Sequence, residues 1–382
     1  MKRRNFLIGA TVITLAEFLA GCETKADLKV QLLKNTIPAQ MVQKFREELA
    51  SGTRLSFKPQ GDLQELFTLL QSWQRQIIEA KQKPPTNQKQ ISEIPNLVTL
   101  GDYWLANAIK QELIQPINSE SLRMWSKLPE KWQQVVRRNN QGYVDPEGKI
   151  WGAPYQWGTT LIAYRVDKFK SLGWEPTDWS DLWREELRHR FSLLNQPREV
   201  IGLTLKKLGE SYNTKSLSKV DNLKSELVKL NQQVKFYSSD SYLQSLIVGD
   251  TWLTVGWSND ILPLLKTRKE IAVVVPRSGT ALWANLWVKP TATNETSLID
   301  KWIDFCWQPE IAAQMSLLTQ TTSPIIPALN QTELTPEIKN NPLLLPEEEI
   351  IQKSDFLYPL ADSTIEQYRQ MWIEMRQSHQ IS

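Results

Sequence analysis

Cysteine and histidine are almost absent from this chain, which has two of each in 382 residues. Transition-metal sites are built mainly from these side chains, and His189 and His379 lie far apart with no Cys or acidic cluster at ligand spacing. We therefore expect no metal site and no other cofactor. A net charge of one sign is also lacking: the formal charge is +3 at pH 7, which argues against a nucleic-acid partner.

The N-terminus combines a basic head with a short apolar stretch. Lys2, Arg3 and Arg4 precede an apolar segment too short for a bilayer span, and Glu17 interrupts it. This pattern predicts a cleaved export signal over residues 1–21 rather than a transmembrane helix. The residues from Arg3 to Leu7 also resemble a twin-arginine signal, so the general and the twin-arginine export routes both stay open.

Cys22 closes the tetrad Leu19-Ala20-Gly21-Cys22, which resembles a bacterial lipobox. The resemblance implies cleavage before Cys22 and acylation of its thiol. We expect a periplasmic protein anchored to a membrane by this lipid, inner or outer; the alternative is a plain amphiphilic N-terminus with a buried Cys22. If Cys22 is acylated, Cys306 is the only free thiol and no disulfide can form within the chain.

Apolar periodicity in the mature chain predicts alternating strands and helices. In the first part, strands are expected near 28–33, 54–57 and 96–100, and helices over 36–49, 63–78 and 104–113. In the second part, strands are expected near 191–194, 235–237 and 251–257, and helices from 198 and over 220–230. The alternation predicts an α/β fold with two lobes, each an open, mostly parallel sheet flanked by helices.

Residues 148–169 break this alternation, and their extended run over 159–164 is expected to leave the first lobe. A helix is predicted over 297–307 with Ser297 as its N-cap, and the apolar stripe of this helix makes Cys306 a core residue. The expected boundaries are a signal at 1–21, a first lobe of 22–157 and 284–326, and a second lobe of 158–283 and 327–382 with C-terminal helices.

Four segments in order resemble the extracellular solute-binding proteins of ABC importers, and within that family the polyamine branch of the spermidine/putrescine type. They are NLVTLGDYWLANAIKQELIQPI from Asn96, GKIWGAPYQWGTTLIAYRVDKF from Gly148, VGDTWLTVGWSNDILPLL from Val248 and VVVPRSGTALWANLWVKPTATN from Val273, joined by LPEEEIIQKSDFL from Leu345. The resemblance implies a type II-like periplasmic-binding-protein fold whose lobes, joined by hinge strands, close over a small polar solute. It also implies a monomer that delivers this solute, a polyamine as first expectation, to a permease and ATPase complex.

The positions that line the solute site in the polyamine branch correspond here to Tyr103, Trp257, Trp283 and Glu199. Aromatic walls with a carboxylate suit a flexible diammonium chain, because methylenes pack on indole faces while each cationic end favours a ring face or a carboxylate. The resemblance therefore implies a solute site built from these four residues.

Two carboxylates of that branch appear here as amides, Asn285 and Gln196. A branch tyrosine and a branch glutamine appear, in a less secure alignment, as Thr321 and Leu357. Losing negative charge weakens ammonium binding, and the two amides would suit a neutral or zwitterionic solute. Asp102 and Asp260 lie beside matched positions and could restore charge, so the solute stays open.

Two other classes of protein are weighed against a transport receptor. An enzyme is disfavoured, because Gly256-Trp257-Ser258-Asn259-Asp260 lacks the final glycine of a nucleophile elbow and neither histidine has an obvious Ser or Asp companion; we predict no catalytic residue. A non-transporting lipoprotein, either a solute sensor or an assembly factor, is the alternative on the same scaffold, since a fold does not fix a function.

Overall fold

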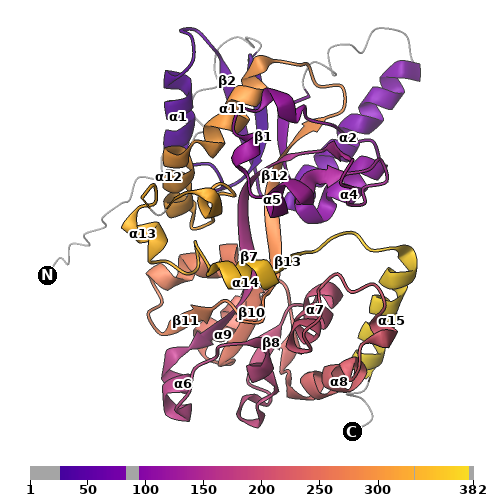
Figure 1. The fold of residues 1–382 in the computed structure, drawn as a ribbon, viewed down its shortest axis with the longest axis vertical. Helices are drawn as coiled ribbons and strands as arrows, with labels where there is room; N and C mark the ends of the chain where they lie inside the picture. Colours follow the sequence, from indigo (N-terminus) through magenta and orange to yellow (C-terminus); the bar gives the residue numbers. More distant parts are fainter. Residues whose placement is uncertain (1–25, 83–93, 331, 378–382) are drawn as a thin grey trace, which may run out of the picture.

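The computed structural model describes residues 26–82, 94–330 and 332–377 (Figure 1). The predicted signal over 1–21 and the predicted lipid-attachment residue Cys22 lie outside the described residues. Within the described ranges, no helix combines the length and the apolar character that a membrane crossing requires.

The upper part of the molecule in Figure 1 begins with parallel strands. Strand β1 (Leu28–Leu33) pairs in parallel with β2 (Leu55–Gln60) on one side and with β3 (Leu97–Gly101) on the other. Helices α1 (Ala39–Glu47) and α2 (Leu63–Gln82) form the connections. The predicted strands and helices of this part are confirmed, with ends that differ by a few residues.

The lower part repeats this arrangement. Strand β8 (Phe191–Leu193) pairs in parallel with β10 (Leu253–Trp257) and with β9 (Phe236–Tyr237). Helices α7 (Pro197–Lys207) and α8 (Leu223–Gln233) lie between these strands in the chain and confirm the two predicted helices. Short helices α6 (Val166–Leu172), α9 (Tyr242–Val248) and α10 (Ser258–Ile261) complete it.

Two long strands join the two parts (Figure 1). The first residues of β7 (Ala153–Arg165) pair with β12 (Ala281–Pro290), and its last residues pair with β10 and with β11 (Ile271–Val274), all antiparallel. Because β12 also pairs with β3, the strand order runs β2-β1-β3-β12-β7-β10-β8-β9. The prediction of an extended run over 159–164 found only half of β7, because this strand is buried on both faces and has no polar alternation.

The C-terminal part returns to both halves of the molecule. Two helices precede the crossing strand β7: α4 (Asp102–Lys110) and α5 (Glu130–Val136). The elements that follow β12 are α11 (Ser297–Trp307), α12 (Pro309–Thr319), α13 (Pro336–Lys339), α14 (Glu348–Lys353), the short strand β13 (Asp355–Phe356) and α15 (Asp362–Gln377).

The prediction of Ser297 as the N-cap of α11 is wrong by one residue. The cap is Thr296, whose hydroxyl accepts from the backbone N–H of Leu298 at 3.3 Å.

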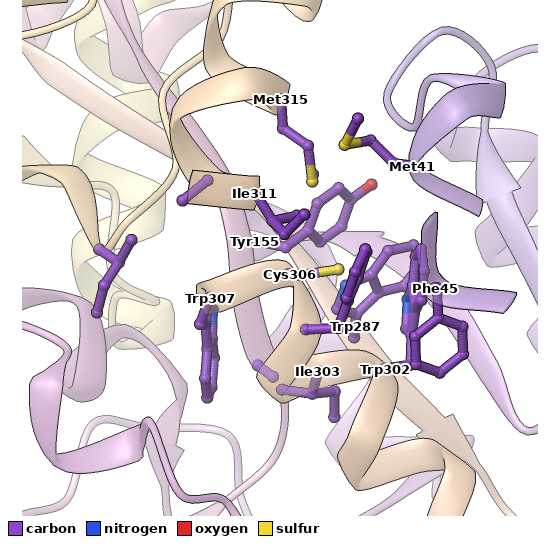
Figure 2. Packing of buried hydrophobic residues seen from close by; sticks show 14 of the residues in the cluster. Met41, Phe45, Tyr155, Trp287, Trp302, Ile303, Cys306, Trp307, Ile311 and Met315 are labelled. Carbon is purple, nitrogen blue, oxygen red and sulfur yellow. The ribbon is translucent and has the colours of Figure 1, made fainter. Parts of the chain in front are cut away.

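The core of the upper part is rich in aromatic side chains. Figure 2 shows Cys306 among large side chains from β7, β12, α1 and α11, where Tyr155 stacks on Trp287 with 4.1 Å between ring centroids. The prediction that Cys306 is a core residue is confirmed by its 0% exposure. Burial also raises the pKa of its thiol, which therefore stays protonated.

The last segment of the chain divides its packing between the two halves. Leu334 and Ile338 lie in the apolar cluster that contains Met41. Tyr368 and Met375, on α15, lie in a different cluster, built around α7 and α8. The chain after α12 therefore contributes first to the upper core and then to the lower one.

Candidate functional site

The strand register brings several predicted site residues to one face of the sheet, where the two halves meet. Residues paired across antiparallel strands share a face, and alternate residues of one strand do too. Along β7 the alternate positions are Gln156, Gly158 and Thr160; their partners are Asn285, Trp283 and Trp257, respectively. The register alone therefore places three predicted site residues on one face.

Glu199 lies over this face, in the first turn of α7, and only 6% of it is exposed. One carboxylate oxygen, Oε1, accepts hydrogen bonds from the Thr160 hydroxyl at 3.0 Å and from the Trp257 indole N–H at 3.2 Å. The other oxygen, Oε2, is buried and has no hydrogen-bond partner among the described residues. A buried acceptor without a partner is unusual and points to a group that the chain itself does not provide.

Burial raises the pKa of Glu199 to about 7. The hydrogen bonds from Trp257 and Thr160 and the positive charge of Arg198 act in the opposite direction, whereas the negative charge of Asp102 raises the pKa further. Near neutral pH this carboxyl group is therefore only partly ionised, and a positive partner would favour its ionised form.

The two predicted tryptophans lie on the same face of the sheet, and Trp257 donates to this carboxylate. Trp257 is half-buried, and its ring meets that of Tyr242 edge to face at 6.4 Å. Trp283 lies across Gly158, where a Cβ atom would be 2.3 Å from both Trp283 Cζ2 and Ser258 Oγ. Only glycine at position 158 therefore leaves room for the indole. The Trp283 N–H is buried and has no hydrogen-bond partner in the described part of the chain.

Tyr103 and Asn285 belong to the upper half and differ in exposure. Tyr103, in the first turn of α4, is 63% exposed and meets Trp104 edge to face at 5.5 Å. Asn285 is 5% exposed, and its amide donates to Gln156 Oε1 at 3.4 Å. Gln156 in turn donates to the Thr36 carbonyl at 3.0 Å. Asn285 is therefore part of a buried amide network that fixes the loop after β1.

Asp102, the first residue of α4, lies near enough for its negative charge to act on Glu199. Its Oδ1 accepts from the backbone N–H of Ala284 at 3.0 Å. Burial raises the pKa of Asp102 to about 6, although the bond from Ala284 and the positive charge of Arg138 lower it. Neither Asp102 nor Glu199 takes part in an ion pair within 4 Å among the described residues.

The remaining predicted positions lie outside this arrangement or are already occupied. Gln196 is exposed at the N-cap of α7, and its side chain forms no hydrogen bond with the described residues. Asp260 accepts from the Tyr242 hydroxyl at 2.8 Å. The Thr321 hydroxyl bonds that of Thr319 at 2.7 Å. Leu357 packs against the lower apolar cluster.

Sequence reasoning missed Thr160 and Arg138. Thr160 lies in a run of buried strand residues, and only its bond to Glu199 makes it distinctive. Arg138 follows another arginine, which is typical of a surface, yet it is 2% exposed. Its Nε and Nη2 donate to the Val135 carbonyl, and its guanidinium lies 5.0 Å from the centroid of the Tyr358 ring. No sequence signal marks either residue.

Residues 92–354 match the family described as bacterial extracellular solute-binding protein, and the chain belongs to this family. It is therefore a solute-binding receptor of the kind that serves ABC transporters, and this membership sets the enzyme alternative aside.

Among known proteins, the spermidine/putrescine-binding periplasmic protein of Escherichia coli is 28% identical over 281 residues, which is 72% of this chain and 76% of that protein. The spermidine/putrescine-binding periplasmic protein 1 of Haemophilus influenzae is 22% identical over 98% of this chain and 99% of its own length. The crystal structure of the spermidine/putrescine substrate-binding protein PotD from Streptococcus pneumoniae superposes with a TM-score of 0.75 at 20% identity, covering 92% of this chain and 98% of that one. The last comparison confirms the predicted two-lobed α/β fold.

Proposed function

We propose that this protein captures a polyamine such as spermidine or putrescine between its lobes and delivers it to an ABC permease and ATPase complex in the membrane. The observation that carries the proposal is the Glu199 carboxylate, which is buried, has one oxygen without a partner among the described residues and accepts a hydrogen bond from Trp257. Such a group gains most from a positive partner, because charge-assisted hydrogen bonds are about twice as strong as neutral ones.

The neighbouring aromatic residues suit the rest of a polyamine. Trp257 and Trp283 offer indole surface on which the methylenes can pack and ring faces for the ammonium groups. Tyr103 is exposed on the opposite lobe and is available to contact the solute as the lobes close. The names of the relatives support this choice of solute. We propose Tyr103, Trp257, Trp283 and Glu199 as direct contacts.

We propose that the chain divides into lobes on β7 and β12, at residues 157/158 and 283/284. The change of pairing partners along β7 supports this division. For the C-terminal segment, the packing of Leu334 and Ile338 favours a boundary later than residue 327. A solute that contacts both lobes favours the closed arrangement by its differential affinity.

We propose that the mature protein is a periplasmic monomer anchored by a lipid on Cys22 after removal of residues 1–21. The lipobox-like tetrad supports this proposal, and the relatives from Escherichia coli and Haemophilus influenzae are periplasmic proteins. Tethering raises the local concentration of the receptor at its permease, which is the physical advantage of an anchor.

The test is a titration of the mature protein with spermidine and putrescine, in which binding is monitored by tryptophan fluorescence and by calorimetry. Neutral amino acids and sugars are the controls. We expect saturable polyamine binding that is lost in Glu199→Gln and kept in Glu310→Gln, an exposed glutamate on α12. A response to neutral amino acids alone would replace the polyamine by a zwitterionic solute. No response to any solute would favour the sensor or assembly factor.

A further inference from the structure

We propose that Asp102 supplies the second carboxylate of the solute site, in place of the one lost at position 285, and binds one ammonium group of the solute while Glu199 binds another. This inference rests on the proposed polyamine function and deepens it, because it assigns the charge that the amide at position 285 cannot provide.

Asp102 is held in place by the way β3 ends. Gly101, the last residue of β3, pairs with Asn285 of β12, so the next residue along β12, Ala284, would pair with Asp102 if the strand continued. Instead α4 begins, and the Asp102 carboxylate accepts the Ala284 N–H at 3.0 Å. This bond uses Oδ1 and fixes the carboxylate next to position 285.

Strand β7 gives the component of the spacing between the two carboxylates that runs along the strand. Ala284, which anchors Asp102, pairs with Trp157, and Thr160, which donates to Glu199, lies three residues further along β7. Strand residues rise by about 3.3 Å, so the two anchor points are roughly 10 Å apart along β7. Gly158 lies between them with the Trp283 indole over it. An apolar surface between two carboxylates matches a methylene chain between two ammonium groups.

The positive groups nearby bond backbone carbonyls, although Arg138 Nη1 and Arg198 Nε are buried without a partner among the described residues. Arg198 donates to the carbonyls of Tyr358 and Tyr212, and Arg138 donates to the carbonyl of Val135. The charge of Arg138 lowers the pKa of Asp102, and that of Arg198 lowers the pKa of Glu199. Among the described residues, however, neither arginine forms an ion pair within 4 Å with either carboxylate. An independent sign that the site lacks a partner is Glu199 Oε2, which is buried and has no hydrogen-bond partner among the described residues.

The other candidates for this role fit less well. Asn285 is buried, carries no charge and bonds Gln156. Asp260 already accepts the Tyr242 hydroxyl and the Asn259 amide. Asp102, by contrast, accepts hydrogen bonds from backbone N–H groups, those of Ala284 and Tyr103, and from no described side chain.

The experiment is a double-mutant cycle in which one charged group is removed from the protein, from the solute, or from both. Putrescine and butylamine, which lacks one ammonium group, are titrated by calorimetry into the wild type, Asp102→Asn and the control Asp221→Asn, an exposed aspartate before α8. We expect the wild type and the control to prefer putrescine by about ten- to a hundred-fold, and Asp102→Asn to lose this preference. The double variant Asp102→Asn with Asn285→Asp, which moves the carboxylate to position 285, should recover it.

The possible outcomes separate the two proposals. Failure of the wild type to bind any polyamine overturns the proposed function and this inference with it. Polyamine binding by the wild type, with an unchanged preference for putrescine in Asp102→Asn, overturns the inference alone. Asparagine at position 102 can still accept the Ala284 N–H, so the variant should fold, and circular dichroism checks this. If Asp102→Asn does not fold, Asp102→Ser is put through the same set of titrations.

Discussion

Replacing Glu199 by glutamine is expected to stabilise the solute-free protein at neutral pH while it removes polyamine binding. Glutamine keeps the shape of the side chain and an Oε1 that can accept from Thr160 and Trp257. It removes the buried charge, for which the described residues provide no ion pair, and places an amide NH2 where the unpartnered Oε2 was. The Glu199 charge would then lower the stability of the solute-free protein while it serves to bind the solute.

The magnitude follows from the pKa of this carboxyl. Burial raises the pKa of Glu199 from the ordinary 4.5 to about 7, and a difference of this size corresponds to about 3 kcal/mol. Because the folded state holds the proton more tightly than the unfolded state, stability falls as the pH rises between these two values. The unfavourable contribution is therefore fully present above pH 7 and is absent below about pH 4.

The assay is urea unfolding of the wild type and Glu199→Gln without solute, followed by tryptophan fluorescence, at about pH 4, 6 and 8. We expect the free energy of unfolding of the variant to exceed that of the wild type by up to about 3 kcal/mol at pH 8 and to match it near pH 4. Glu310→Gln is the control and should show no such trend. Lower stability of Glu199→Gln at pH 8, or a difference that does not change with pH, would refute the reasoning.

Three further predictions concern binding and localisation. Spermidine affinity should rise with pH through about 6 to 7, where Asp102 and Glu199 lose their protons; calorimetry across this window checks it, and a flat profile would contradict the role of these carboxylates. Gly158→Ala should displace the Trp283 indole, since the new Cβ would lie 2.3 Å from it, and so weaken polyamine binding and shift the tryptophan emission; unchanged emission and affinity would speak against that packing. Cys22→Ser should abolish labelling by radioactive palmitate and release the protein from the membrane fraction; continued labelling would place the lipid elsewhere.

The sequence by itself determined most of the local structure and the family. Strands and helices with a clear apolar period, such as β1 and α11, show it in the sequence and were predicted nearly to the residue. Strand β7 was predicted too short, because burial on both faces removes the alternation that reveals a strand. The N-cap of α11 was misplaced because Thr296 and Ser297 are both good cap residues and only the backbone angles distinguish them.

What only the tertiary structure decided is which side chains meet. The register of β7 with β10 and β12 puts Trp257, Trp283 and Asn285 on one face, and that register depends on contacts between segments about 100 to 130 residues apart in the chain. The bond between Asp102 and Ala284 depends on where β3 stops, and the unpaired oxygen of Glu199 depends on how α7 lies over β7. Composition and periodicity describe one element at a time, whereas a binding site is a set of distances between elements, and only the folded chain determines these distances.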